Sequence, residues 1–193
     1  MKGNAMKKIT GINGFGRFGL HLIKYWLDRS SEANFRIDFI NDDFLTIDDA
    51  YDMITQDMSV VFNKYKVKKI GSIIRFIAAD GKLHEIEYTN FSKDDIPWVG
   101  KPDYFLECSG KNTIKEDCQG FLTGNTKMVA ISATSWDCDK VLVYGFNEEE
   151  YQSKDDKVIS YGSCTVNAYV PIGEYMQKKY GILDSDVNVI HNI

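Results

Sequence analysis

Cys164 is the side chain most suited to nucleophilic chemistry, because it stands where an apolar segment turns into a helix. Residues 157–160 form the apolar segment, Gly162 gives the turn backbone freedom, and Ser163 or Thr165 can cap a helix that continues to about residue 179. Free N–H groups and the positive end of the helix dipole favour a thiolate at such a position. The alternative is a small buried cysteine beside a helix cap, the more common situation for a single cysteine.

Three glycines near the start of the chain suggest a second kind of chemistry, the binding of a pyrophosphate. Gly14, Gly16 and Gly19 follow the apolar segment 8–12 and precede an amphipathic segment at 20–27. In a strand–turn–helix unit the first glycine permits the turn, the second admits the pyrophosphate to the backbone, and the third lets the helix pack on the strand. Glycine-rich turns before helices are common, so the pattern alone does not establish a dinucleotide site.

Asp42 strengthens the dinucleotide interpretation. It follows the apolar segment 35–40, and an acidic residue there, about 20 residues past the glycines, accepts hydrogen bonds from the adenosine ribose. Its charge would repel a 2′-phosphate, which favours NAD over NADP. The alternative is that Asn41 and Asp42 cap the helix predicted at 46–54.

The remaining apolar segments predict an α/β fold of the Rossmann type, a doubly wound and mostly parallel sheet. Strands are expected at 104–107, 127–131, 140–144, 157–160 and 186–191, with a helix at 114–121. Segments 73–77 and 83–88 flank an Asp-Gly turn and predict an inserted β-hairpin. Because ligands bind beyond the carboxyl ends of parallel strands, Ser109, Gly110 and Ser132 are further candidates for the cofactor crevice.

Composition narrows the class of protein. The 193 residues are 44% hydrophobic and 13% aromatic, which is ordinary for a globular protein, and the net charge of -5 gives no reason to expect nucleic acid or an anionic membrane as partner. No apolar run is long enough to span a bilayer, and no signal peptide is recognisable, so we expect a cytoplasmic protein. The four cysteines form no CxxC pair, and neither a disulfide framework nor a metal site is indicated.

The order of these motifs resembles the glyceraldehyde-3-phosphate dehydrogenase family. The similar stretches are Ile-Asn-Gly-Phe-Gly-Arg at 12–17, Phe-Ile-Asn-Asp at 39–42, Glu-Cys-Ser-Gly at 107–110, Ile-Ser-Ala-Thr-Ser at 131–135, Gly-Phe-Asn at 145–147 with Tyr151, and Ser-Cys-Thr-Val-Asn at 163–167 with Pro171. Their colinear order is far more specific than any one of them. The resemblance runs from about residue 8 to residue 193.

The resemblance implies that Cys164 is the nucleophile and His191 the base that activates it. A thiolate adds to an aldehyde, the thiohemiacetal gives hydride to NAD, and phosphate or water takes up the resulting thioester. The resemblance also assigns the binding residues: Ser163 and Thr165 for the attacking phosphate, the backbone of Arg17 and Phe18 for the pyrophosphate, Asp42 for the ribose, and Ser132 near the nicotinamide.

The sequence also departs from the family pattern, which leaves the aldehyde open. Phe18, Leu20, Phe91 and Ala168 replace residues typical of the family, so we expect a divergent member. An erythrose-4-phosphate dehydrogenase-like enzyme and a non-catalytic NAD-binding module that acts through a partner remain alternatives.

The length of the family's members bears on the domain organisation. They continue through a substrate domain, so we expect 1–161 to form the NAD-binding domain and 162–193 to supply only the first helix and strand of an incomplete catalytic domain. Such a chain would have little activity alone, and its full-length form would be a homo-oligomer.

Overall fold

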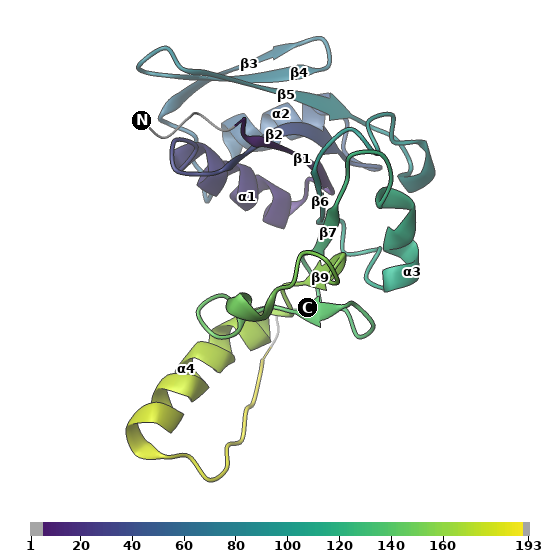
Figure 1. Ribbon diagram of the computed structural model, residues 1–193. Helices are drawn as coiled ribbons and strands as arrows, with labels where there is room; N and C mark the ends of the chain where they lie inside the picture. The colour runs from purple at the N-terminus through teal and green to yellow at the C-terminus, as the bar shows by residue number, and fades with distance from the viewer. Residues whose placement is uncertain (1–5, 191–193) are drawn as a thin grey trace, which may run out of the picture.

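The computed structural model describes residues 6–190, and a single sheet organises them (Figure 1). Its nine strands lie in the order β3-β4-β5-β2-β1-β6-β7-β9-β8. The strands from β5 to β8 in this order pair in parallel, whereas β3–β4 and β4–β5 pair antiparallel. The predicted Rossmann-type α/β fold with an inserted hairpin is therefore confirmed. The strands are β1 (Lys8–Asn13), β2 (Phe35–Asn41), β3 (Tyr65–Ile70), β4 (Ile73–Ala78), β5 (Leu83–Thr89), β6 (Tyr104–Glu107), β7 (Met128–Ile131), β8 (Lys140–Val141) and β9 (Val158–Ser160).

The helices are α1 (Arg17–Asp28), α2 (Ile47–Gln56), α3 (Lys115–Cys118) and α4 (Cys164–Tyr180), with short 3₁₀ turns at Lys93–Asp95, Gln119–Phe121 and Glu148–Glu150. Residues of α1, α2 and α3 belong to the cores against the sheet, whereas α4 contributes none. Because side chains alternate along a strand, β6 serves two cores. Leu106 packs against the core under α1 and α2, and Phe105 lies in the core that contains Trp98 and Phe121.

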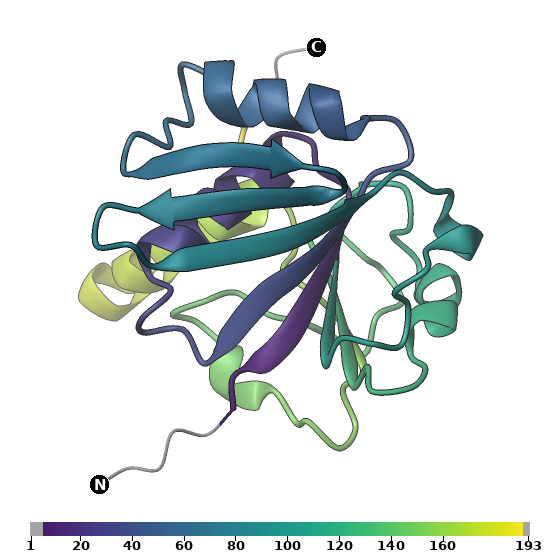
Figure 2. The same cartoon turned by 90° about the horizontal axis from the view of Figure 1, so that it is seen from above.

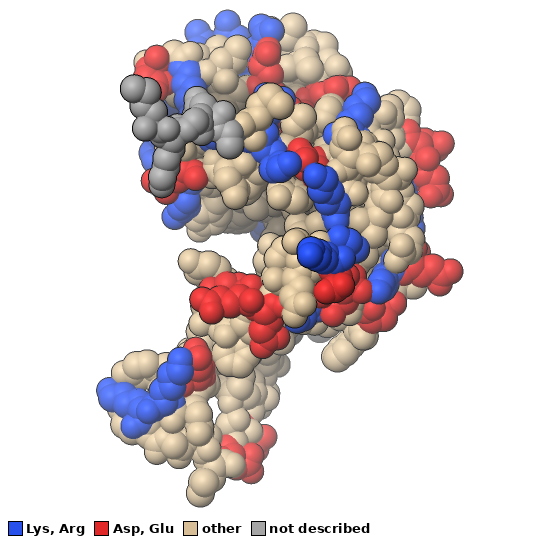
Figure 3. Space-filling model, viewed as in Figure 1, with Lys and Arg blue, Asp and Glu red and all other residues tan. Residues whose placement is uncertain are grey.

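Helix α4 differs from the others in its surroundings. It projects away from the sheet, and residues 181–190 return beside it without regular structure (Figure 1). None of its 17 residues is buried. No helix among the residues described here is both long and apolar enough to cross a membrane. Acidic and basic side chains are interspersed over the visible face of the molecule (Figure 3).

Three elements differ from the expectations. Strand β3 was not predicted, and with it the hairpin becomes a three-stranded antiparallel unit. Strand β8 ends at Val141 instead of residue 144, because the backbone N–H of Val143 donates to Oδ1 of Asn147 at 2.7 Å and so enters a turn.

The strand predicted at 186–191 is not formed over residues 186–190, which are irregular and exposed. A strand needs a neighbouring strand to pair its N–H and C=O groups, and no strand in the described part of the chain pairs with this segment. His191 lies outside the described residues.

Candidate functional site: the cofactor crevice and the Cys164 turn

The glycine turn lies at the topological switch point of the sheet. Strand β1 is flanked by β2 and β6, and the chain leaves β1 at its carboxyl end between these two neighbours. The N–H of Gly14 donates to the carbonyl of Asn41 at 2.7 Å, and the N–H of Cys108 donates to the carbonyl of Asn13 at 2.7 Å. Open α/β sheets bind ligands in the crevice at such a point.

The three glycines have three different surroundings. A Cβ on Gly14 would stand 2.4 Å from the backbone N of Ser109, and the residue has a φ of +97°. A Cβ on Gly19 would stand 2.6 Å from the carbonyl oxygen of Gly14, where the helix packs on the turn. A Cβ on Gly16 would meet nothing within 4 Å. The first and third glycines are thus required by close packing of the protein itself, whereas the second faces open space.

Helix α1 begins at this open glycine. Gly16 is the N-cap residue and offers no side chain, so no side-chain cap occupies the first turn. The side chain of Arg17 instead donates to Oγ of Ser59 at 2.8 Å, and Phe18 is half-exposed. Free N–H groups at a helix start can bind an anionic group.

Asp42 follows β2 at the position predicted for a ribose-binding carboxylate, and its oxygens accept hydrogen bonds from the backbone around the crevice. Oδ2 accepts from the N–H of Phe15 at 2.7 Å, and Oδ1 accepts from Phe44 at 2.9 Å and Leu45 at 2.8 Å. The carboxylate therefore ties the glycine turn to the loop after β2. The alternative helix-cap role is wrong, because Thr46 caps α2 in a capping box with Asp49.

A buried hydrogen-bond network of polar side chains beneath the crevice was not predicted from the sequence. Glu107 accepts from the side-chain amides of Asn13 at 2.8 Å and Asn112 at 3.0 Å. Asn41 donates to Oδ1 of Asn13 at 3.0 Å and accepts from Oγ1 of Thr89 at 2.9 Å. Polar residues at the last positions of four neighbouring apolar strands were the available signal. This hydrogen-bond network connects the carboxyl ends of β5, β2, β1 and β6.

Ser109, Gly110 and Ser132 lie where the sequence places them, at the ends of β6 and β7. Both N–H and Oγ of Ser109 donate to Oε1 of Glu107, and the N–H of Ser132 donates to the carbonyl of Glu107 at 2.9 Å. Gly110 has a φ of +72° and open space around it. The hydrogen bond from Ser132 therefore joins the ends of β6 and β7, whereas those from Ser109 fix the loop that follows β6.

Ser132 also borders an apolar pocket of about 430 Å³ against the sheet, together with Phe18, Cys108 and Tyr161. Burial raises the pKa of Cys108 to about 12, so this thiol is neutral at physiological pH. The pocket also contains Thr10, whose buried hydroxyl has no hydrogen-bond partner among the described residues.

The Cys164 turn is built by its neighbours. Oγ of Ser163 accepts from the N–H of Val166 at 3.0 Å, so Ser163 is the cap and Cys164 is the first residue of α4, as predicted. Oγ of Ser160 donates to the carbonyl of Ala133 at 2.6 Å and accepts from the N–H of Gly162 at 3.0 Å. Cys164 itself is exposed, which excludes the alternative of a buried structural cysteine in this structure.

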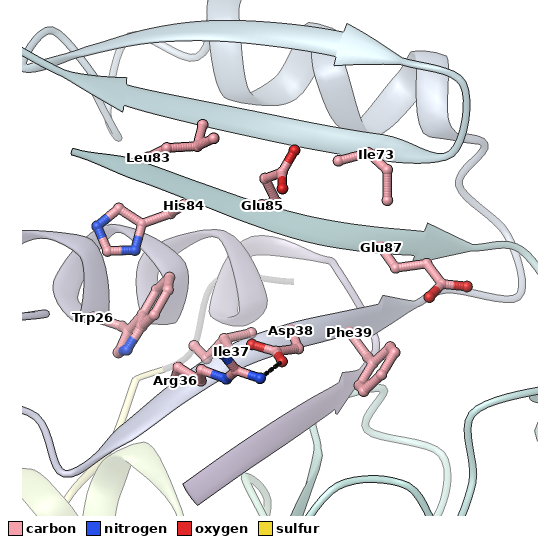
Figure 4. A pocket seen from close by; sticks show the side chains of 10 residues that line it. All are labelled: Trp26, Arg36, Ile37, Asp38, Phe39, Ile73, Leu83, His84, Glu85 and Glu87. Atoms are coloured by element: carbon pink, nitrogen blue, oxygen red, sulfur yellow. Dashed lines mark ion pairs between the residues drawn. The ribbon is translucent and has the colours of Figure 1, made fainter. Parts of the chain in front are cut away.

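A second hollow, of about 440 Å³, lies between β2 and β5 and contains none of the candidate site residues. The two strands pair only from Phe39 to Asn41, and they diverge toward their amino ends (Figure 2). Charged side chains line the gap, among them Arg36 and Asp38, which form an ion pair at 2.9 Å (Figure 4). This hollow follows from the strand geometry and does not adjoin the glycine turn. No cluster of three or more His, Cys, Asp or Glu side chains suited to a metal ion occurs within residues 6–190.

Several known dehydrogenases are similar to this chain in amino-acid sequence. Glyceraldehyde-3-phosphate dehydrogenase 4 of Caenorhabditis elegans is 33% identical over 97% of this chain and 54% of its own length. The chain is homologous to part of glyceraldehyde-3-phosphate dehydrogenase. The Lactobacillus delbrueckii dehydrogenase is 30% identical over 94% of the chain, and the cytosolic dehydrogenase of Taxus baccata is 31% identical over 99%. The chain spans about half the length of these dehydrogenases. No family model matches the chain.

Proposed function

We propose that this chain carries the cofactor-binding part and the nucleophile of an NAD-dependent dehydrogenase that oxidises a small phosphorylated aldehyde. The observation that supports it most is the glycine turn at the switch point. Gly14 and Gly19 abut backbone while Gly16 faces open space, which is the arrangement a bound pyrophosphate requires. An exposed cysteine at a helix start follows later in the chain, and the dehydrogenase of Caenorhabditis elegans is similar to the chain over 97% of its length.

NAD is the proposed cofactor, and when bound it supplies the hydride acceptor. Its pyrophosphate would lie against Gly16 and the N–H groups of Arg17 and Phe18, and its adenosine ribose beside Asp42. Ser132 would then border the nicotinamide half, because it ends β7 on the other side of β1, and Ser109 and Gly110 at the end of β6 would border the crevice. The protein would bind the cofactor and orient it toward the substrate, and the cofactor would supply the redox chemistry.

Cys164 would attack the aldehyde as a thiolate and form a C–S bond, with His191 taking the thiol proton. The resulting thiohemiacetal would lose a hydride to the nicotinamide of NAD and its hydroxyl proton to a base, which leaves a thioester on Cys164. Attack by inorganic phosphate, held by Ser163 and Thr165, breaks the C–S bond and releases an acyl phosphate, while water in its place releases a carboxylate. The start of α4 favours the thiolate through its dipole and its N–H groups.

We further propose that residues 1–161 form the cofactor unit and that α4 belongs to the unit that completes the substrate site. Homo-oligomerisation of the whole enzyme and a cytoplasmic location are part of the same proposal. The relative from Taxus baccata, which is named cytosolic, supports the location.

The binding half of the proposal is tested by calorimetric titration of the chain with NAD. Gly16→Val should weaken NAD binding at least about tenfold, because its side chain would occupy the space of the pyrophosphate. Gly120→Val is a matched control, since a Cβ on Gly120 also meets nothing within 4 Å. Equal NAD affinity in the two variants would contradict the proposal.

The chemical half is tested at Cys164. Alkylation by iodoacetamide, followed thiol by thiol with mass spectrometry, should be faster at Cys164 than at a cysteine in an unstructured peptide. Aldehyde-dependent NADH formation by the whole enzyme, including a single-turnover burst, should disappear in Cys164→Ser. NAD binding with no unusual reactivity of Cys164 toward iodoacetamide, and with no burst from the whole enzyme, would favour the non-catalytic NAD-binding module. Comparison of glyceraldehyde 3-phosphate with erythrose 4-phosphate would identify the aldehyde.

A further inference from the structure

The adenosine side of the crevice has a rim whose charged residues the proposed function leaves unused. Lys111 stands in the loop after β6, and Asp43 and Phe44 stand in the loop after β2, so that β1 and its glycine turn lie between them. Nζ of Lys111 lies 2.7 Å from Oδ2 of Asp43 and 5.8 Å from the centre of the Phe44 ring. This ion pair spans the two walls of the crevice.

Asp43 of this rim and the adjacent Asp42 have different hydrogen-bond partners. Asp42 gives both of its oxygens to backbone N–H groups and is 8% exposed, so its position is fixed. The side chain of Asp43 is 39% exposed, and Lys111 neutralises its charge. The hydrogen bond with Asp43 raises the pKa of Lys111, and the charges of Asp43, Asp42 and Glu107 add to this effect. The ammonium group of Lys111 is therefore attracted by the carboxylate of Asp42, which is proposed to bind the ribose.

We propose that Lys111 and Asp43 together set the selectivity for the substituent on the 2′ oxygen of the cofactor's adenosine ribose. The inference rests on the proposed function, in that the crevice binds a dinucleotide. A carboxylate after the second strand of such a fold favours a free 2′-hydroxyl, whereas a cationic side chain nearby accommodates a 2′-phosphate. Both kinds of group are present here, and Asp43 determines whether the cation is available.

The charge balance gives the direction of the effect. With the Lys111–Asp43 pair intact, the two charges cancel and Asp42 alone disfavours a 2′-phosphate. Without Asp43, the ammonium becomes free for the phosphate, whose charge of about −2 attracts it more strongly than a carboxylate does. Without Lys111, Asp43 adds a second repulsive charge. The side chain of Lys111 is long and 58% exposed, so it can move between the two partners.

The experiment measures the dissociation constants of NAD and NADP for the 193-residue chain by calorimetry at low ionic strength, with thermal unfolding as the check on folding. Asp43→Asn should tighten NADP relative to NAD by about threefold to tenfold, the range for one charge a few ångströms away in a water-exposed site. Lys111→Gln should weaken NADP relative to NAD by a similar factor. The double variant should return the ratio to within about twofold of the original chain, because it removes both charges.

Glu85→Gln is the control matched to Asp43→Asn. It also removes one negative charge from an ion pair, here the pair with Arg75 on the β4–β5 hairpin. It should leave the NADP-to-NAD ratio unchanged. The inference is overturned if Asp43→Asn and Lys111→Gln give the same ratio as Glu85→Gln while NAD still binds. If the original chain binds neither dinucleotide, the proposed function fails and this inference fails with it. About 0.5 M salt should diminish both expected effects.

Discussion

Helices α1 and α4 both follow a strand of the sheet and both begin beside a turn with a proposed chemical role, yet their surroundings are opposite. Helix α1 has 12 residues and buries Gly19, Leu20, Ile23, Trp26 and Leu27. Helix α4 has 17 residues and buries none, and its apolar side chains such as Ile172 and Tyr175 are exposed. The glycine turn is therefore held by the packing of its helix, whereas the Cys164 turn is held by hydrogen bonds at the helix start.

This difference separates preorganisation of a binding site from preorganisation of a nucleophile. The position of Gly16 depends on the core below α1 and on Asp42. The position of Cys164 depends on local contacts from Ser160, Ser163 and Asn167, the last of which donates to the carbonyl of Tyr161 at 2.6 Å. Changes to the core should consequently affect the cofactor crevice first, and changes to single hydrogen bonds should affect the Cys164 turn first.

The largest expected difference comes from truncating one isoleucine in each helix. Ile23 is 0% exposed and Ile172 is 61% exposed. Ile23→Ala should lower the free energy of unfolding by about 2–5 kcal/mol, since it opens a cavity in the core. Ile172→Ala, an identical change in chemistry, should stay within about 0.5 kcal/mol. Urea unfolding measures both, and comparable losses would show that α4 is packed in solution.

Gly14 and Gly16 provide the next contrast, within the glycine turn itself. Gly14→Ala should destabilise the fold by about 1–3 kcal/mol from the strained backbone alone, with a further contribution from the clash at Ser109. Gly16 has a φ of −70° and open space, so Gly16→Ala should leave the unfolding free energy almost unchanged. Thermal unfolding of the pair distinguishes the two roles, and equal losses would refute the assignment of one glycine to packing and the other to ligand approach.

Acid dependence should reveal how the β9 end is secured. Burial alone would raise the pKa of Asp139, but hydrogen bonds from Lys115 and from the backbone N–H groups of Val158 and Lys157 outweigh burial and lower it. The stabilisation is therefore fully present above the ordinary pKa of 3.8 and is lost as the pH falls through the lower folded-state pKa. Asp139→Asn should remove about 1–2 kcal/mol at pH 7. The deficit should shrink below pH 4 in urea titrations, and a deficit independent of pH would contradict this origin.

The smallest expected effect concerns the caps. Ser163→Ala should remove about 1 kcal/mol from α4, because the cap is a main support of a helix without buried residues. Amide hydrogen exchange in residues 164–168 should accelerate, while exchange in α1, which has no side-chain cap, serves as the internal reference. Thr46→Ala at α2 is the matched control, since that cap lies on a helix with buried residues. Unchanged exchange in α4 would indicate support from elsewhere.

The sequence predicted the fold where hydrophobic period and turn chemistry agree. The apolar strands 8–12, 35–40 and 104–107, the glycine turn and the helix start at Cys164 are found within one to three residues of their predicted places. Strand β3 was missed because its burial alternates weakly and its lysines are typical of a solvated edge. The shortening of β8 depends on Asn147, whose contact with Val143 no periodicity reveals.

The sequence predicted where the candidate site residues lie along the strands, but it did not predict their contacts. The residues from Gly14 to Ser132 lie along the carboxyl ends of the strands, because parallel pairing brings these ends to one edge. The spacing could not show that Asp42 is occupied by three backbone N–H groups, nor that Lys111 pairs with Asp43 across 68 residues. Such contacts depend on side-chain directions that only the folded chain defines.

The buried hydrogen-bond network from Glu107 through Asn13 and Asn41 to Thr89 also favours one register of the strands. If β1 slipped by one residue against β2 and β6, Ile12 or Gly14 would replace Asn13, and the buried amide of Asn41 and carboxylate of Glu107 would each lose a partner. A misaligned sheet would thus be penalised at several buried groups at once. The hydrogen bonds among these four strand ends therefore select the strand register that places the glycine turn at the crevice.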